Sequence, residues 1–471
     1  MELSGTVTVF LALYLTYLIV VSIKRGVSKK GNLPPGPTPL PVIGNFLQLK
    51  SGRTIESLLK LREKYGPVFT VYFGNRPVVV LCGHEAVKEA LIDKAEEFRY
   101  GELPVSAWAG EHLRHRWKLL RRFSLTVLRN FGMGKKSIEE RIQEEAQFLL
   151  EEFQKTRQEP FDPTFFLSRA VSNIICSIVF GDRFDYGDQE FQALLRMMND
   201  SFREMSTPWA QFYDMYANIL KFFPGPHTKI YDLLEEMRLF IARKVKRNQE
   251  TLDPNAPRDF IDCFLIQMDK EKGNPASEFN LPNLELTTLN LFFAGTETVS
   301  STLRYGFLLL MKYPEVQGGG PASEGTWSGR GFSKRPFCWP WNGAEGQVPL
   351  GPPRSAERHS PSPQGTEIYP MLTSVLHDPS MFKTPDTFNP GHFLDESGCF
   401  RKTAAFVPFS SGKRLCLGEG LARMELFLFF TTILQRFRLK PLLPPQDISL
   451  APREKGFATI PPFYKLCIVP R

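Results

Sequence analysis

The chain has 471 residues, more than a single hydrophobic core usually holds, and its 42% hydrophobic and 23% charged residues are ordinary for a globular protein. The 58 Lys and Arg residues against 50 Asp and Glu leave a net charge of +8, which favours an anionic membrane face or an acidic protein partner. No basic tract is interleaved with aromatic residues, so we predict no nucleic-acid binding.

The first predicted element is a membrane anchor. Residues 3–23 are mostly apolar and uncharged, and about 20 residues suit a helix that spans a bilayer. The basic residues that follow are Lys24, Arg25, Lys29 and Lys30. By the positive-inside rule they place the rest of the chain in the cytosol. A cleaved signal peptide is the alternative, but it requires a basic leading region and a shorter apolar stretch. We therefore predict an uncleaved anchor with a basic flank over residues 1–30.

A proline-rich connector follows the anchor. Residues 33–41 read LPPGPTPLP, and because proline fixes φ and removes a donor, this stretch is expected to be extended. We assign residues 31–45 to the connector and residues 46–471 to one globular domain. The connector would fix the height and tilt of the globular domain over the bilayer. The alternative is an ordinary proline-rich linker without that role.

The rest of the chain is predicted to be mainly α with a small β portion. Helical spacing of apolar residues predicts helices at 56–65, 84–93, from 117 onward, 137–155, 165–180, 190–205, 228–249, 284–312 and 424–437. β-Branched and aromatic residues at 68–73 and 77–81 predict a hairpin between the first two helices.

One cysteine has an unusual setting. The seven cysteines include no CxxC pair and predict no disulfide framework in a cytosolic body. Cys416 lies in the segment from Phe409 to Gly418, FSSGKRLCLG, whose glycines allow backbone N–H groups close to the sulfur. Arg414 and the start of the following helix favour an anion there. A thiolate held in this way suits an axial iron ligand, and the alternative is an inert cysteine in a glycine-rich turn.

A second motif interrupts the long apolar helix. Residues 294–298 read AGTET, where a buried acid is costly and a helical glycine costs about 1 kcal/mol relative to alanine. Both choices make sense if the helix crosses a cofactor, because small residues open room for a diatomic ligand. The neighbouring Glu297 carboxyl and Thr298 hydroxyl could then relay protons. The alternative is a helix with a polar solvent stripe.

A third pair, Trp117 and Arg121, shares one helix face, so the indole N–H and the guanidinium can reach the same carboxylate. The alternative is a surface cation beside a buried tryptophan.

Together these motifs resemble the cytochrome P-450 superfamily. F-x-x-G-x-R-x-C-x-G matches its haem loop, A-G-x-E-T its oxygen-activation motif and W-x-x-x-R its propionate-binding pair. Residues 34–45, 122–132, 287–313 and 388–395 further resemble the microsomal family two, and residues 298–314 look most like its A, F and G subfamilies.

The resemblance implies a cytochrome P-450 fold that binds haem b. Cys416 would ligate the iron within a loop running from Phe409 to Gly418, and Arg414, Trp117 and Arg121 would hold propionates. Thr298 would assist oxygen activation, and Glu297 would connect it to solvent. The substrate pocket would use Phe292, Phe293, Ala294 and Phe457.

The implied activity is a monooxygenase that inserts one atom of O2 into small apolar substrates such as xenobiotics, odorants and steroids. Electrons would come from NADPH through NADPH-cytochrome P-450 reductase, with cytochrome b5 as a further candidate partner. The basic residues expected to meet this donor are Arg114, Arg116, Lys118 and Arg122. The chain would sit on membrane lipid at the endoplasmic reticulum, with its catalytic domain on the cytosolic face.

Two windows depart from the family. Residues 318–364 are rich in Gly and Pro, hold three of the six tryptophans and contain no Glu-x-x-R, where the family has a helix bearing it. This composition predicts an irregular, exposed segment, as a frame-shifted or mis-spliced exon would give. The loop over residues 99–116 is shorter than in the family. A catalytically impaired or haem-deficient isoform is therefore the alternative function, and a lipid- or steroid-binding module is a third.

Overall fold

The structure is a computed structural model that describes residues 16–17, 33–49, 53–95, 113–133, 136–318, 367–396, 399–455 and 458–471. The predicted anchor, apart from Thr16 and Tyr17, lies outside the described residues. So do Phe457, residues 319–364 of the aberrant window and most of the short loop at 99–116. Among the described residues, no helix combines the length and apolar character that crossing a bilayer requires.

Helices dominate the described chain, as the sequence predicts. They are α2 (Thr54–Tyr65), α3 (His84–Lys88), α4 (Leu113–Asn130), α5 (Lys136–Lys155), α6 (Thr164–Val179), α7 (Gln189–Met205), α8 (Pro208–Leu220), α9 (His227–Glu250), α10 (Phe260–Lys270), α11 (Leu281–Lys312), α12 (Pro314–Gly318), α13 (Leu372–Leu376) and α14 (Glu419–Arg436). Short turns are η1 (Phe46–Gln48), η2 (Glu89–Asp93), η5 (Pro390–Phe393), η6 (Gly412–Arg414) and η7 (Pro445–Asp447). The predicted helices are confirmed to within about five residues, whereas α8, α10 and the short helices α12 and α13 were not predicted.

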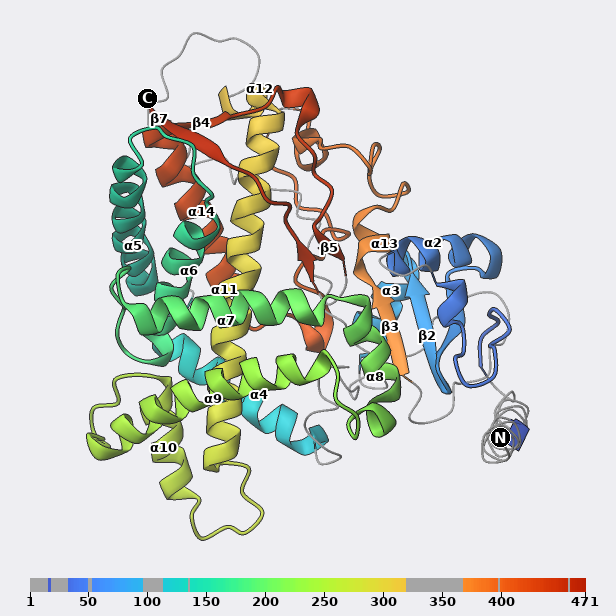
Figure 1. Cartoon of the computed structure of the whole chain (residues 1–471), viewed down its shortest axis with the longest axis horizontal. Helices are drawn as coiled ribbons and strands as arrows, with labels where there is room; N and C mark the ends of the chain where they lie inside the picture. Colours follow the sequence, from blue (N-terminus) through green and yellow to red (C-terminus); the bar gives the residue numbers. More distant parts are fainter. Residues whose placement is uncertain are drawn as a thin grey trace, which may run out of the picture.

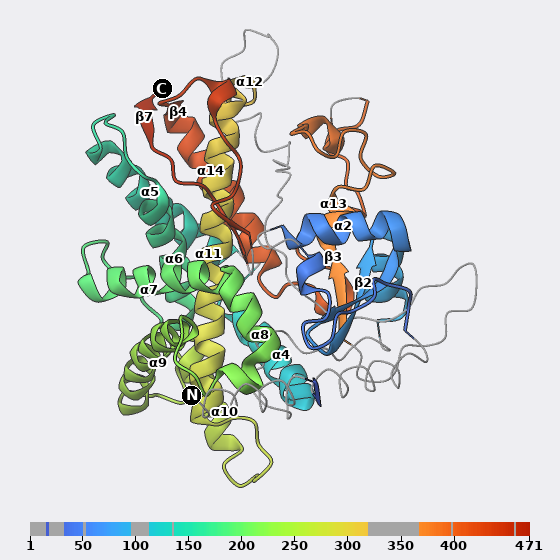
Figure 2. The same cartoon turned by 45° about the vertical axis from the view of Figure 1, so that its right-hand side comes forward.

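Within the described residues, the small β portion forms three sheets. Strands β1 (Val68–Phe73) and β2 (Arg76–Cys82) make the predicted antiparallel hairpin, and β3 (Glu367–Met371) adds to β2 in parallel. This sheet lies to one side of the helical body, next to α2, α3 and α13 (Figure 1; Figure 2). The other pairs are β4 (Phe437–Pro441) with β7 (Leu466–Pro470) and β5 (Glu454–Lys455) with β6 (Thr459–Ile460).

Helix α11 is the central element of the fold. It runs through the middle of the molecule in Figure 1 and contributes to both large hydrophobic clusters of the core. Its start is capped by Asn280, whose side chain accepts a hydrogen bond from the N–H of Asn283 at 3.0 Å. Phe307 of α11 meets Phe430 of α14 with ring centroids 6.2 Å apart, and both rings are fully buried. Burying a phenylalanine contributes roughly 1.5–3 kcal/mol, so this contact joins α11 firmly to α14.

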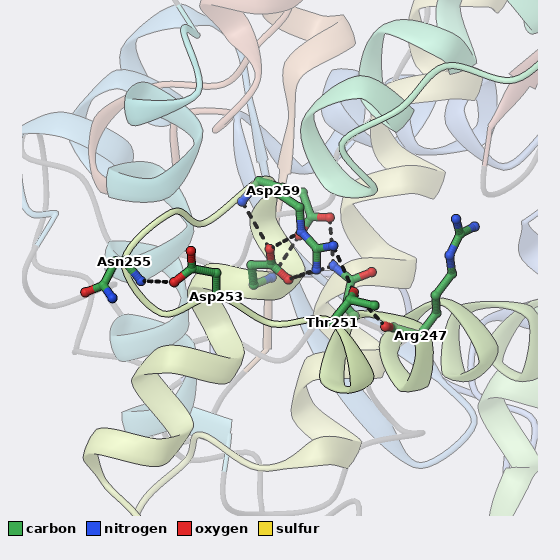
Figure 3. A network of polar contacts seen from close by, with 8 residues as sticks. Arg247, Thr251, Asp253, Asn255 and Asp259 are labelled. Carbon is green, nitrogen blue, oxygen red and sulfur yellow. Dashed lines mark hydrogen bonds and ion pairs between the residues drawn. The ribbon is translucent and has the colours of Figure 1, made fainter.

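Polar contacts hold the corner between α9 and α10 (Figure 3). The Asn248 amide donates to Asp259 and to Asp262 at 2.8 Å, and Arg258 pairs with Asp262 at 2.7 Å. Burial alone would raise the pKa of Asp262, but hydrogen bonds from Arg258 lower that pKa below its usual value. The corner is therefore a closed polar network with a structural role.

Candidate haem site

The Cys416 loop connects the turn η6 to the start of α14. The Cys416 N–H donates to the Phe409 carbonyl at 2.9 Å, and φ is +66° at Ser410 and +63° at Gly412. The Cys416 side chain is solvent-exposed. Desolvation by the surrounding protein raises the pKa of its thiol, and a hydrogen bond from the Gly418 N–H and the charge of Arg121 partly offset this. An accessible sulfur that already receives a backbone N–H is suited to bind a metal as a thiolate.

Two guanidinium groups surround the Trp117 ring. The Arg414 Cζ lies 4.0 Å and the Arg121 Cζ 5.4 Å from the ring centroid, and Arg121 also donates to the Leu415 carbonyl. Burial, together with the positive charge of Arg121, lowers the pKa of Arg414 to about 10. Two like charges around one indole favour an anionic ligand, and carboxylates such as haem propionates meet this requirement. The structure thus brings together Trp117, Arg121, Arg414 and Cys416.

An accessible stripe on one face of the largely buried helix α11 runs into the AGTET segment. Asn290 and Ala294 are exposed and Thr298 is half-buried, four residues apart on one face of α11. The Thr298 hydroxyl donates to the Ala294 carbonyl at 2.6 Å. Gly295 serves helix packing, because a Cβ there would lie 3.0 Å from the Ile175 side chain of α6. Asn290 was missed from sequence, although a polar residue two turns before Thr298 in an apolar helix was the available signal.

Glu297 is placed differently from the expectation that it connects Thr298 to solvent. Its side chain is buried, and its Oε1 lies 2.5 Å from Nη2 of Arg304 and accepts a hydrogen bond from the Ser301 hydroxyl at 2.7 Å. The reason is helical spacing, since Arg304 lies seven residues on and shares the buried face of α11. Glu297 therefore belongs to a buried ion pair with Arg304.

Aromatic residues of α7 and α11 pack together near the predicted substrate pocket. Phe293 stacks on Phe202 with ring centroids 4.2 Å apart and an interplanar angle of 13°. Phe292 is fully buried against Phe180, so its ring fills the core. Phe457 lies outside the described residues, but the next residue, Ala458, donates its N–H to the Ser206 hydroxyl at the end of α7.

A mainly helical body with an accessible thiol beside a cationic cradle suits a haem-thiolate protein. The family model "Cytochrome P450" matches residues 34–318 and 359–468, and the chain belongs to the cytochrome P450 family. Cytochrome P450 2G1 of Oryctolagus cuniculus is 57% identical over 500 aligned residues, which cover 100% of both chains. Cytochrome P450 2G1 of Rattus norvegicus is 56% identical, again over 100% of both, and Cytochrome P450 2A6 of Homo sapiens is 52% identical over 99% of each.

These findings confirm the resemblance to family two. The protein is accordingly a haem monooxygenase of this family, whose iron takes a cysteine thiolate as its axial ligand and which uses O2 and an organic substrate. The family match is interrupted between residues 318 and 359, within the window in which no Glu-x-x-R is found.

Proposed function

We propose that this chain oxygenates small apolar compounds, such as xenobiotics, odorants or steroids, with Cys416 as the ligand of the haem iron. The observation that carries the proposal is the Cys416 loop, in which an accessible thiol receives the Gly418 N–H while the Phe409 carbonyl fixes the cysteine backbone. The bound haem would supply oxygen activation, with the thiolate favouring cleavage of the O–O bond.

The other site residues hold the cofactor and the substrate. Arg414, Arg121 and Trp117 would bind propionates through charge-assisted hydrogen bonds. The Thr298 hydroxyl, half-buried on the accessible stripe of α11, would donate a proton during the reaction, and Glu297 would take part only after its pairing with Arg304 changes.

An apolar wall would select the substrate. It would comprise the stacked Phe293 and Phe202 beside the exposed Ala294, with Phe292 supporting it from the core and Phe457 completing it. The exposed Asn290 would offer a polar contact to such a substrate. A largely apolar pocket with few polar groups suits a small, flat molecule.

The electron donor would be NADPH-cytochrome P450 reductase, with cytochrome b5 as a second candidate. Lys118 and Arg122 on α4 are exposed, close in sequence to the Trp117 cluster, and suit an acidic docking face. Arg116 is less available, because it pairs with Glu278 at 2.9 Å. Residues 1–30 would anchor the chain to lipid of the endoplasmic reticulum, with the catalytic domain in the cytosol.

The test of iron ligation compares two exposed cysteines. Cys416→Ala should abolish the strongly red-shifted Soret band of the reduced, CO-bound protein, whereas Cys399→Ala should leave it unchanged because Cys399 lies outside the loop. Persistence of the red-shifted band in Cys416→Ala would refute the assignment.

A second candidate function, a haem-deficient isoform, is favoured by the interrupted family match and the missing Glu-x-x-R. In the family this helix pairs with the region that corresponds to His392, and loss of one partner of a buried pair costs about 3–5 kcal/mol, against a total margin of about 5–15 kcal/mol. The chain should be expressed beside a version whose residues 318–364 are replaced by a family-like segment with Glu-x-x-R. Higher haem occupancy in the replaced version would support the impaired form, and equal occupancy and thermal stability would exclude it.

A further inference from the structure

The turn η2 continues α3 as a wider helix. The Lys94 N–H donates to the Glu89 carbonyl at 2.8 Å, five residues earlier, so this turn is π-helical. Two ion pairs span it, Lys94 with Glu89 at 3.3 Å and Lys88 with Asp93 at 3.0 Å. A π-helical turn inserts one residue into a helix and occurs often at functional positions.

The backbone of η2 meets the Cys416 loop. A Cβ on Gly412 would lie 1.8 Å from the Leu91 carbonyl oxygen, so only glycine fits there, and its φ of +63° also favours glycine. The Leu91 side chain is 1% exposed and belongs to the same hydrophobic cluster as Ala405, in the segment that leads into the loop. Leu91 of η2 therefore lies against the backbone of the loop at Gly412, and its side chain belongs to the hydrophobic cluster that includes Ala405, just before the loop.

Two backbone hydrogen bonds close the loop between Gly412 and Cys416. The Leu415 N–H donates to the Gly412 carbonyl at 3.2 Å, and the Cys416 N–H donates to the Phe409 carbonyl at 2.9 Å. We therefore expect a displacement of Gly412 to move the turn that carries Cys416, because both bonds lie within residues 409–416.

We propose that the π-helical turn η2 positions the Cys416 loop, with the Leu91 carbonyl setting where the Gly412 backbone and hence the sulfur lie. The role of η2 as a positioning element for an iron ligand rests on the proposed function of Cys416. The contact between η2 and the loop does not, and it can be tested in the haem-free chain.

The first test separates the close approach from the backbone conformation. Gly412→Ala should displace the loop, whereas Gly66→Ala is a matched control, because Gly66 also has a positive φ, of +88°, but a Cβ there would meet nothing within 4 Å. We expect amide exchange of the Cys416 N–H to be at least about tenfold faster in Gly412→Ala and unchanged in Gly66→Ala, since local opening sets the exchange rate.

The second test changes η2 itself. Deleting Ile92, whose side chain is 50% exposed, should convert η2 to an ordinary helical turn with little loss of core packing and rotate the Leu91 carbonyl away from Gly412. Deletion of Gly273, which lies in a turn where a Cβ would meet nothing within 4 Å, is the control. The Ile92 deletion should speed exchange at Cys416 about tenfold and, in the haem-loaded protein, move the Soret band of the reduced CO complex to a less red-shifted position.

Amide exchange at Cys416 tests the positioning by η2, and the Soret band of the CO complex tests Cys416 as the iron ligand. If the unaltered chain has no red-shifted band, the assignment of Cys416 as ligand fails, but the exchange rates still test the positioning by η2. Equal exchange at Cys416 in the unaltered chain and the Ile92 deletion would overturn the positioning role. If far-ultraviolet circular dichroism shows the deletion to be unfolded, the comparison of Gly412→Ala with Gly66→Ala decides alone.

Discussion

Replacing Arg304 by methionine should destabilise the chain strongly, because it leaves the Glu297 carboxylate buried without its cation. The two side chains are only 5% and 4% exposed, and the pair is 2.5 Å apart. Removing one partner of a buried pair costs about 3–5 kcal/mol. The Ser301 hydroxyl donates to Glu297 at 2.7 Å in both proteins, so it does not offset this loss. We therefore expect a loss of about 3–5 kcal/mol in the free energy of unfolding.

Urea denaturation followed by circular dichroism measures this loss. Arg243→Met is the matched control, since Arg243 also lies 2.5 Å from a carboxylate, that of Glu190, but both side chains are more than half exposed, and such pairs contribute about 0–1 kcal/mol. The double variant Glu297→Gln/Arg304→Met should recover most of the loss, because a neutral amide is less costly to bury. If Arg304→Met loses no more than Arg243→Met, the buried ion pair does not stabilise α11 as argued.

Three further predictions concern catalysis, pH and attachment. Thr298→Ala should keep the haem content but lower the fraction of NADPH that yields product, and unchanged coupling would count against a proton-donating hydroxyl. Burial raises the pKa of Glu425 well above its usual value. Above about pH 4.3 this carboxyl therefore holds its proton in the folded chain but loses it in the unfolded chain. The free energy of unfolding consequently falls as pH rises. Glu425→Gln should therefore gain more stability over the unaltered chain at pH 8 than at pH 5, and an equal gain at both would contradict a buried neutral acid. Deleting residues 1–30 should leave the fold but reduce co-sedimentation with lipid vesicles, and equally tight binding would show that the anchor is not the main attachment.

Local sequence signals predicted the elements that depend on local contacts. The hairpin of β1 and β2 and the long helix α11 follow from the residues within them. Strand β3 was missed because its pairing, Val78 with Glu367, joins distant parts of the chain. Helix α14 begins at Glu419, five residues before the predicted 424, because the glycines of the loop resemble a helix break.

The contacts of the site residues likewise divide into those that the sequence predicts and those that join distant segments. The spacing around Cys416 placed Arg414 near the sulfur, and the family resemblance implied that Trp117 and Arg121 bind the same cofactor. The structure places Arg414 and Arg121 around the Trp117 ring. The ion pair of Glu297 with Arg304 could have been found from their seven-residue spacing on one face. The contact of η2 with the loop could not, because a π-helical turn has no sequence signature and the two segments are far apart in the chain.

The absorption spectrum of the reduced, CO-bound chain, recorded together with its haem content, tests the central claim most directly. The claim is that this chain holds haem iron through the thiolate of Cys416. We expect one haem per chain and a strongly red-shifted Soret band that is lost in Cys416→Ala. A less shifted band, or no haem absorption in a chain that is folded by circular dichroism, would contradict it.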